Sequence, residues 1–415
     1  MERVIFHCDL NNFYASVECL HHPQYRNIPM AVGGDVEKRH GIILAKNMLA
    51  KKAGVTTGEA LWQAMQKCPN LTIVKPNFSL YLRFSRLVRE IYADYTDRIE
   101  SFGIDEVWMD VTESVKLFGD PVELANTIRQ RIKEEVGITA SIGVSFNKVF
   151  AKLGSDYKKP DATTVITRDN MEQVVFPLPV EDLLYVGRAT TQKMHLMGIM
   201  TIGDCARTDV GLLKRRFGKW GEYLWRFANG LDNSPVLTYR QEPPVKSIGN
   251  STTCPRDLAN IQDVKIVAYV LAESVAARLK EAHLMGSVIS IGVRDIHLHG
   301  YTRQIKLQQA TNLSEDIAQT ALTLFEANID FSTPLRSIGI KVSDLQVDGQ
   351  PQQLTLFRDP REQERALALE TAIETIRDKY GFTSVQRLVM KEDPLLSSFN
   401  PKHDHVIFPE SYFKG

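Results

Sequence analysis

The sequence predicts a multidomain α/β protein, and three observations lead to that prediction. The chain has 415 residues, which is enough for two to four domains. Short apolar runs alternate with longer amphipathic stretches, which is typical of strands interleaved with helices. Residues 245–344 read as strand, long helix, two strands, helix and strand, which is a βαββαβ module of the split βαβ kind. Because 43% of the residues are hydrophobic, the domains can form sizeable cores.

The overall composition excludes several classes of protein. Fifty Lys and Arg balance fifty Asp and Glu, so any nucleic-acid-binding surface must be local. There is no run of 18 apolar residues and no signal peptide, so we expect no membrane span and a cytoplasmic location. The cysteines are five and never form a CxxC pair, which predicts free thiols and no zinc cluster: Cys8, Cys19, Cys68, Cys205 and Cys254.

The amino-terminal half begins with a predicted strand, Val4–Cys8, that leads directly to Asp9. Asn11 or Asn12 is expected to cap a helix carrying Tyr14–Cys19. A strand pair is predicted further on, joined by a turn that begins at Gly103. The pair comprises Arg98–Phe102 and Val107–Val111, and a small helical insertion containing Gly41–Ala53 and Glu59–Lys67 precedes it.

The next segment has the β-branched run Thr139–Val144, which predicts a strand, followed by a helix over Asn147–Lys152. Tyr157–Asp161 is predicted as a turn because Pro160 disfavours helix at the residue before it. Residues 170–232 read as all-helical, and Pro243-Pro244 marks a linker.

In the carboxyl-terminal half, the long helix of the βαββαβ module is expected at Ile261–Lys280 and its last strand at Leu335–Val342. A late amphipathic helix is predicted from apolar residues spaced 4, 3 and 4 apart, with Gly381 ending it: Leu369, Ile373, Ile376 and Tyr380.

Three acids carry the clearest chemical signal. Asp9, Asp105 and Glu106 each follow a predicted strand or lie in a tight turn. Mg²⁺ prefers such hard oxygen ligands, and a pair of ions about 4 Å apart can clamp both oxygens of an in-line phosphoryl displacement. Strict strand alternation would separate Asp105 from Glu106 unless the turn at Gly103 prevents it. The alternative is that Asp-Glu in a turn is simply solvated.

Three long motifs containing these acids resemble those of Y-family, translesion DNA polymerases. They are Asp9–Glu18, Phe102–Thr112 and Ser141–Lys152, the last continuing to Ser155-Asp156 and Lys159-Pro160. Their order and spacing match over residues 1 to about 345, and the chain is most similar to bacterial polymerase IV-like or UmuC-type members. The resemblance implies a palm (1–30 and 77–167), small fingers (31–76), a helical thumb (168–240), a little finger (245–344) and a tail (345–415).

The resemblance also implies roles for individual residues. Asp9 and Asp105 would bridge two Mg²⁺ ions, for which Mn²⁺ can substitute, Glu106 would hold the ion at the primer 3′-hydroxyl, and the Leu10 carbonyl would complete the set. Tyr14 would be the steric gate against ribonucleotides, with the alternative of a core aromatic. Other dNTP-binding positions would be Phe13, Ala45, Lys51 and Lys159. The short or aliphatic residues Ile43 and Ala45 over the base pair would favour low fidelity.

Several positions depart from the family pattern. Asn11 stands where an acid is common, Gly103 replaces a usual serine, and Met48 and Lys51 stand where tyrosine and arginine often hold the triphosphate. Met48 cannot donate a hydrogen bond, and Lys51 is a point charge rather than a bidentate fork.

DNA-holding parts are implied in both halves. Val186–Asp204 resembles a helix-hairpin-helix, in which Gly187 would offer its backbone to phosphates although Tyr185 replaces the first glycine; the alternative is an ordinary αα-hairpin. The nearby basic run Lys214–Arg216 and Lys219 is equally consistent with a solvated face. In the little finger, Lys246, Ser247 and Arg336 would start strands along the DNA backbone.

The tail contains a pentapeptide that resembles a bacterial sliding-clamp-binding motif. Its anchors would be Gln353, Leu354, Leu356 and Phe357, and the alternative is a short buried strand.

The function that these features predict is magnesium-dependent, template-directed and error-prone DNA synthesis past damaged bases by a monomer that binds primed DNA, dNTP and the clamp. Two rivals stay open. One is a nucleotide cyclase with a similar palm, and the other is a non-catalytic DNA- and clamp-binding scaffold.

Overall fold

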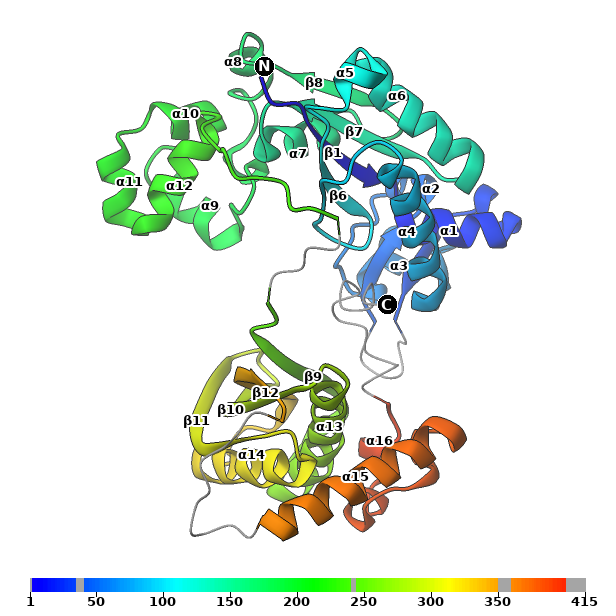
Figure 1. Ribbon diagram of the computed structural model, residues 1–415, viewed down its shortest axis with the longest axis vertical. Coiled ribbons are helices and arrows are strands. Elements are labelled where there is room, and N and C mark those ends of the chain that lie inside the picture. The colour runs from blue at the N-terminus through cyan, green and yellow to red at the C-terminus, as the bar shows by residue number, and fades with distance from the viewer. Residues whose placement is uncertain (1, 35–40, 240–243, 350–359, 401–415) are drawn as a thin grey trace. The chain divides into compact units, whose positions relative to one another are not determined.

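The computed structural model describes residues 2–34, 41–239, 244–349 and 360–400, except for the side chains of Pro360 and Gln363. The chain divides into two compact units (Figure 1). The first contains residues 2–34 and 42–239, and the second contains residues 244–349 and 360–400. The break falls at the predicted linker, of which Pro243 lies outside the described residues. The finer boundaries between palm, fingers and thumb stay a prediction.

The first unit is built on a five-stranded sheet. Its strand order is β5-β6-β1-β7-β8, with β1 antiparallel to β6 and β7 and with β7 parallel to β8. The strands are β1 Ile5–Leu10, β5 Ile99–Ser101, β6 Glu106–Asp110, β7 Ala140–Ser145 and β8 Thr163–Ile166. These bounds confirm the predicted strands to within one or two residues.

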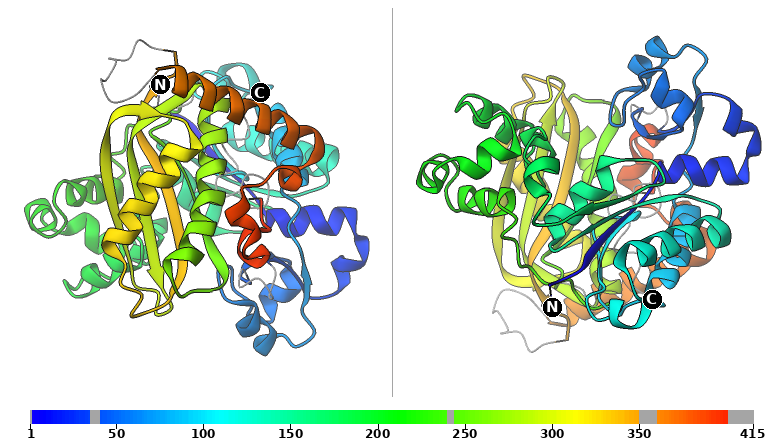
Figure 2. Two further views of the ribbon diagram at one scale, coloured as in Figure 1. Left: turned by 90° about the horizontal axis from the view of Figure 1, so that it is seen from below. Right: turned by 90° about the horizontal axis from the view of Figure 1, so that it is seen from above.

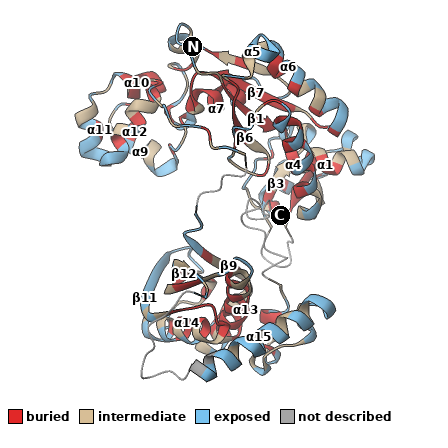
Figure 3. Ribbon diagram, in the orientation of Figure 1, coloured by how far each residue is buried: buried red, intermediate tan, exposed pale blue. Residues whose placement is uncertain are grey.

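Helices cover both faces of this sheet, so that β1 is buried along its whole length (Figure 3). Phe6, Cys8 and Leu10 pack in one core with residues of α4 and α6, whereas Ile5 packs with Trp108 and Ala151 of α7 on the other face. Asp9 shares the second face because side chains alternate along a strand. The helices are α1 Phe13–His21, α4 Phe78–Ala93, α5 Val115–Phe118, α6 Pro121–Arg131 and α7 Lys148–Tyr157.

The sequence analysis predicted a helical insertion between α1 and α4, and this prediction is wrong in part because the insertion also contains a sheet. Its three-stranded sheet has the order β3-β2-β4, with β2 Met30–Gly33, β3 Ile43–Lys46 and β4 Thr72–Val74. Two helices accompany it, α2 Met48–Lys52 and α3 Leu61–Lys67. The strands are three or four residues long, and such short apolar runs cannot be told from helix by periodicity.

Residues 170–232 are helical, as predicted, and the hairpin of α9 and α10 lies within them. Thr201 caps α10 by accepting the Asp204 N–H at 3.1 Å, and the Asp204 carboxylate accepts the Thr201 N–H at 2.9 Å. The helices are α8 Met171–Val174, α9 Arg188–His195, α10 Ile202–Arg207, α11 Val210–Phe217 and α12 Lys219–Ala228.

The second unit confirms the βαββαβ order. Its antiparallel sheet has the order β11-β10-β12-β9, and α13 and α14 lie together on one face (Figure 2). The elements are β9 Ser247–Leu258, α13 Ile261–Glu281, β10 Leu284–Asp295, β11 Gly300–Thr311, α14 Ser314–Asn328 and β12 Leu335–Val347.

The late helix α15 Pro360–Tyr380 is present, and Gly381 follows it with a φ of 94°. Its predicted apolar stripe does not form the packed face, because Leu369 and Tyr380 are 63% and 68% exposed. Ion pairs attach α15 to the unit instead. The chain then continues into α16 Pro394–Ser397, where Met390 and Leu396 are fully buried in the core of this unit.

None of the described helices has the length and apolarity needed to cross a membrane. All five cysteines are free thiols, which confirms that prediction.

Candidate functional site

The three predicted acids lie together at one end of the first unit's sheet. Asp9 of β1 is directly opposite Glu106 of β6 in the antiparallel register. Asp105 precedes β6 and belongs to the turn, so strand alternation does not send it to the opposite face from Glu106. Its carbonyl accepts the Leu10 N–H at 3.1 Å, which ties the turn to the end of β1.

Two buried side chains of α4 hold this turn. Arg89 donates from Nη2 to the Gly103 carbonyl at 2.8 Å, and the Ser85 hydroxyl donates to the Ile104 carbonyl. Both side chains are buried. Sequence analysis missed these positioning residues, because nothing in the sequence relates α4 to a turn about 15 residues later.

Crowding of the carboxylates changes their proton affinity. Burial raises the pKa of Asp105 to about 7, and the charges of Asp9 and Glu106 contribute to the rise. Burial also raises the pKa of Asp9, and a hydrogen bond with Glu106 adds to the effect. Perturbed carboxylates gathered at one point are a physical sign of a functional site.

Two lysines neutralise part of this charge. Lys159 donates from Nζ to Asp9 Oδ2 at 2.6 Å, and Lys152 of α7 donates to Glu106 Oε1 at 2.9 Å. Asp156 pairs with both, at 2.6 Å to Lys159 and 3.3 Å to Lys152. Lys159 was a predicted site residue, whereas Lys152 was recognised only as part of a motif.

His7 is a further residue that the sequence analysis missed. It lies two positions before Asp9 on the same strand, and that spacing alone places it on the face of the acids. Its Nδ1 lies 2.8 Å from the Ser155 hydroxyl, and its Nε2 lies 3.6 Å from Glu106 Oε2 without a hydrogen-bond partner among the described residues. Burial holds the pKa of His7 well below its usual value, so the ring is neutral.

The side chain of Asn11 connects the end of β1 to neighbouring segments. Its side-chain amide donates to the Ser141 hydroxyl at 2.9 Å, and its carbonyl oxygen accepts from the Thr139 hydroxyl and the Asp161 N–H. Asn11 therefore ties β1 to β7 and to the turn after α7. Asn12, at the start of α1, makes no side-chain cap.

Tyr14 projects from the first turn of α1 beside the acids. Burial raises the pKa of Tyr14 to about 12, and the nearby charge of Asp105 adds to the rise. The ring stacks on Tyr81 at 4.3 Å between centroids, and the Tyr81 hydroxyl donates to Glu18. Phe13, by contrast, is buried in the core, so only its backbone is available to a ligand.

The finger positions lie on the small sheet and on α2. Ala45 of β3 is half-buried, and Lys51 of α2 is exposed close enough to Lys46 for its charge to help lower the pKa of Lys46. Desolvation is the first cause of that shift. Met48 begins α2, where its side chain adds no polar group. Lys46 is therefore a second cation near Lys51 that the sequence analysis did not single out.

The predicted DNA-binding residues are distributed over both units. Gly187 is the residue before α9, and a Cβ added there would meet nothing within 4 Å. Lys246 and Ser247 are exposed at the start of β9, while Arg336 lies at the start of β12. These two strands run antiparallel, and Ser247 pairs with Ser343, so Arg336 lies toward the other end of the sheet. The predicted clamp peptide, Gln353–Phe357, lies outside the described residues.

The residues around Asp9 fit a divalent cation in their chemistry. Hard carboxylate oxygens are preferred ligands of Mg²⁺, and mutual repulsion of the acids is what a bound cation would relieve. In the described part of the chain, no three His, Cys, Asp or Glu side chains are already grouped as ion ligands. Instead, the lysine ammonium groups contact the carboxylates that would hold the ion.

Comparisons with known proteins agree on one family. The chain matches the impB/mucB/samB family over residues 8–156, the C-terminal domain of that family over 245–356, and a "DNA polymerase-iota, thumb domain" over 181–232. It is 51% identical to DNA polymerase IV of Acetivibrio thermocellus, covering 95% of this chain and 98% of that protein. It is 40% identical to DNA polymerase IV 2 of Halalkalibacterium halodurans, covering 94% and 95%.

A solved structure has a similar fold. It is a Y-family DNA polymerase chimera of Dbh and Dpo4, with a TM-score of 0.72 and 24% identity, and the match covers 83% of this chain and all of that one.

Proposed function

Because the chain belongs to the impB/mucB/samB family of Y-family DNA polymerases and is a DNA-directed DNA polymerase for translesion synthesis, we propose that it transfers nucleotides by two-metal chemistry at Asp9, Asp105 and Glu106. The observation that supports the proposal is the convergence of these acids, with the pKa of Asp105 raised to about 7 by burial and by its neighbours. Such crowding of carboxylates indicates a cation-binding site.

The chain's own residues position the reaction. Asp9 and Asp105 would hold both ions, Glu106 would hold the ion at the primer end, and the Leu10 carbonyl would complete the set. When bound, the ions would lower the pKa of the primer 3′-hydroxyl and neutralise the leaving pyrophosphate. Arg89 and Ser85 keep the Asp105 turn in place, which is a rigid second layer behind the acids.

Lys152 and Lys159 would exchange partners when substrate binds. Their ammonium groups now balance Asp9, Asp156 and Glu106. A dNTP arrives with its own negative charge, so Lys159 would turn to the triphosphate while the carboxylates turn to the ions. Lys46 and Lys51 of the fingers would add charge to that site.

The sugar and the base pair would be checked loosely. Tyr14 is held by its stack on Tyr81 and would clash with a ribose 2′-hydroxyl. The small side chain of Ala45 on a three-stranded sheet would cover the base pair with little steric control, which would favour errors and bypass of damage.

The test is extension of a primed template with four dNTPs and Mg²⁺. We expect the wild-type chain to extend the primer and the Asp105→Ala and Glu106→Ala variants to lose extension. Asp169→Ala, which removes an exposed acid on the same unit, is the matched control and should retain extension. Cyclic-nucleotide formation without extension would instead support a cyclase. Absence of both products would support a scaffold.

We also propose that residues 353–357 bind the bacterial sliding clamp. The motif that supports this is Gln-Leu-Thr-Leu-Phe. Replacing Leu356 and Phe357 with alanine should shorten products made with clamp and leave synthesis without clamp unchanged. Leu388→Ala, at an 85% exposed leucine of the second unit, is the control.

A further inference from the structure

Four aromatic side chains form a cluster on the thumb that the polymerase mechanism does not use. They come from the loop before α9 and from α12, and they are Tyr185, Trp220, Tyr223 and Phe227. The ring centroid of Tyr185 lies 5.7 Å from that of Trp220 and 6.2 Å from that of Phe227, and Trp220 lies 5.6 Å from Tyr223. Tyr185 is 52% exposed, and Trp220 and Tyr223 are also exposed, so the rings border solvent rather than fill a core.

Tyr185 adopts a backbone conformation that is unfavourable for tyrosine. Its φ is 70°, a left-handed conformation that glycine adopts freely and that a bulky residue rarely adopts. Such strain persists only when the surroundings over-determine it and is concentrated at functional sites. Because the ring is half-exposed, its apolar burial does little to offset this backbone strain. The chain therefore keeps an aromatic ring at a position of this hairpin where glycine would fit the backbone better.

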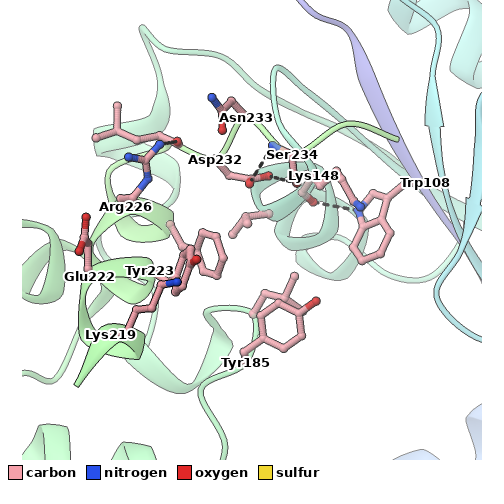
Figure 4. Close-up of a pocket in the computed structure, with 14 residues that line it drawn as sticks. Trp108, Lys148, Tyr185, Lys219, Glu222, Tyr223, Arg226, Asp232, Asn233 and Ser234 are labelled. Carbon is pink, nitrogen blue, oxygen red and sulfur yellow. Dashed lines mark hydrogen bonds between the residues drawn. The ribbon is translucent and has the colours of Figure 1, made fainter. Parts of the chain in front are cut away.

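The cluster borders a cavity of ≈ 520 Å³ between the thumb and the palm (Figure 4). That volume lies within the roughly 300–1,000 Å³ of typical small-ligand sites. Tyr185, Tyr223 and Trp108 approach the cavity from a loop, from α12 and from β6. Trp108 is only 2% exposed and the Lys148 ammonium group lies 4.5 Å from its ring centroid, so Tyr185 and Tyr223 are the rings that a planar group can reach.

The charges beside the cavity favour an anionic ligand. Lys219 lines it, and its ammonium group lies 5.8 Å from the Tyr223 ring centroid. Of the lining acids, Glu222 pairs with Lys214 at 2.9 Å, whereas Asp232 accepts hydrogen bonds from Ser234 and keeps its charge. Lys148 pairs with Glu100 at 2.6 Å, so Lys219 and Arg226 supply the positive excess over Asp232. Arg226 also lines the cavity, and the exposed residues Arg215 and Arg216 lie on the preceding helix, α11.

We infer that this thumb pocket binds an unpaired nucleotide of single-stranded DNA. The base stacks on Tyr185 and Tyr223, and the flanking phosphates lie beside Lys219 and Arg226. Exposed aromatics interleaved with cations are what single-strand-binding proteins use, because every base has a face that can stack. This goes beyond synthesis at the acids, and it differs from a hairpin contact at Gly187, which would use phosphates only.

The experiment measures binding of the full chain to a fluorescent 16-nucleotide oligo-dT by anisotropy, without dNTP. An abasic oligonucleotide with the same phosphates is the second ligand. Stacking of one base is worth about 1–3 kcal/mol, so we expect wild-type chain to bind oligo-dT roughly 5- to 150-fold more tightly than the abasic strand. Tyr185→Gly, which suits the left-handed backbone, and Tyr223→Leu should each lose most of that preference and leave abasic binding unchanged.

Controls separate this inference from other outcomes. Trp62→Ala removes a tryptophan that is 58% exposed on α3 and should keep the full preference for oligo-dT. Asp105→Ala should also keep it, so failure of the proposed catalysis and failure of this site are distinguishable. Equal binding of the two oligonucleotides by wild-type chain, or an unchanged preference in both tyrosine variants, would overturn the inference. Complete displacement of oligo-dT by equimolar free dTMP would overturn the assignment to a strand.

Discussion

The two units use carboxylates in opposite ways. In the first unit, Asp9, Asp105 and Glu106 crowd together, and burial and mutual repulsion raise the pKa values of Asp9 and Asp105. In the second unit, Arg256 bonds Asp263 and Asp393 at 2.7 Å, and these bonds lower the pKa values of both acids. The acids of the first unit repel one another despite two nearby lysines, whereas Asp263 and Asp393 are each bonded to a guanidinium group, and acids held in this way are called balanced acids below.

The difference separates acids that serve a ligand from acids that hold the fold. The balanced acids attach the segment after residue 360 to α13 and α14. Glu273 of α13 lies between Arg377 and Arg387, at 2.9 Å from each, and Lys280 pairs with Glu370 at 2.7 Å. An acid bonded to an arginine gains little from a further cation, whereas acids that repel one another gain more from one.

Replacing an acid of the crowded cluster gives the largest expected effect. Asp105→Asn should reduce the rate of single-turnover dNTP incorporation by roughly 10³-fold or more, since electrostatic groups at a reacting centre contribute on that scale. Its free energy of unfolding should stay the same or rise without Mg²⁺, because one repelling charge is removed. Rapid-quench incorporation and urea denaturation measure the two effects.

The matched control is at the far end of β6, the strand that follows Asp105. Asp110 accepts hydrogen bonds from the N–H and the hydroxyl of Thr112 at 3.0 and 2.6 Å, so it resembles the balanced acids. Asp110→Asn should lower the free energy of unfolding by about 1–2 kcal/mol. If Asp105→Asn were the more destabilising of the two variants, the contrast drawn between the two kinds of acid would be wrong.

Tyr14→Ala tests whether the aromatic beside the crowded acids also serves the ligand. Removing the ring should admit ribonucleotides and reduce discrimination between dNTP and rNTP by roughly tenfold or more, because a steric check works through contact with the 2′-hydroxyl. Primer extension with one rNTP against the matching dNTP measures it. Tyr14→Phe should retain discrimination, and sugar selection that is unchanged in Tyr14→Ala would contradict the assignment.

The acid cluster was predictable from the sequence, but its supports were not. Asp9 and Glu106 follow or begin apolar runs, and strand pairing brings such residues together. Lys152 and His7 had signals of spacing only, and Arg89 had none, because it acts across the fold on a backbone carbonyl. The strands of the fingers were not predicted, because apolar runs of three or four residues are too short to distinguish strand from helix. The late helix was predicted from its apolar stripe, yet it packs through Glu370, Glu374 and Arg377.

Glu273→Gln should break the balanced cluster. It removes the charge that two arginines share at a side chain only 9% exposed, and breaking a largely buried pair is worth about 3 kcal/mol. We expect faster hydrogen exchange over residues 385–400, because the ion pair of Arg387 with Glu273 attaches that segment near its start. Glu326→Gln on the exposed side of α14 is the control. Unchanged exchange in Glu273→Gln would show that apolar burial of Met390 and Leu396 holds the segment alone.

Acid should weaken the balanced cluster, with the smallest effect of the four. The pKa values of Asp263 and Asp393 are lowered by hydrogen bonds from Arg256, so their contribution to stability is complete above the unfolded value of about 4 and is lost as pH falls through the folded values. The loss should be about 1 kcal/mol, since Arg256 is 38% exposed and solvent screens the pairs. Arg256→Met should remove this part of the difference between urea denaturation at pH 6 and at pH 3.5. A variant as sensitive to acid as the wild-type chain would mean that these pairs do not hold the segment, and the contrast would then rest on Glu273.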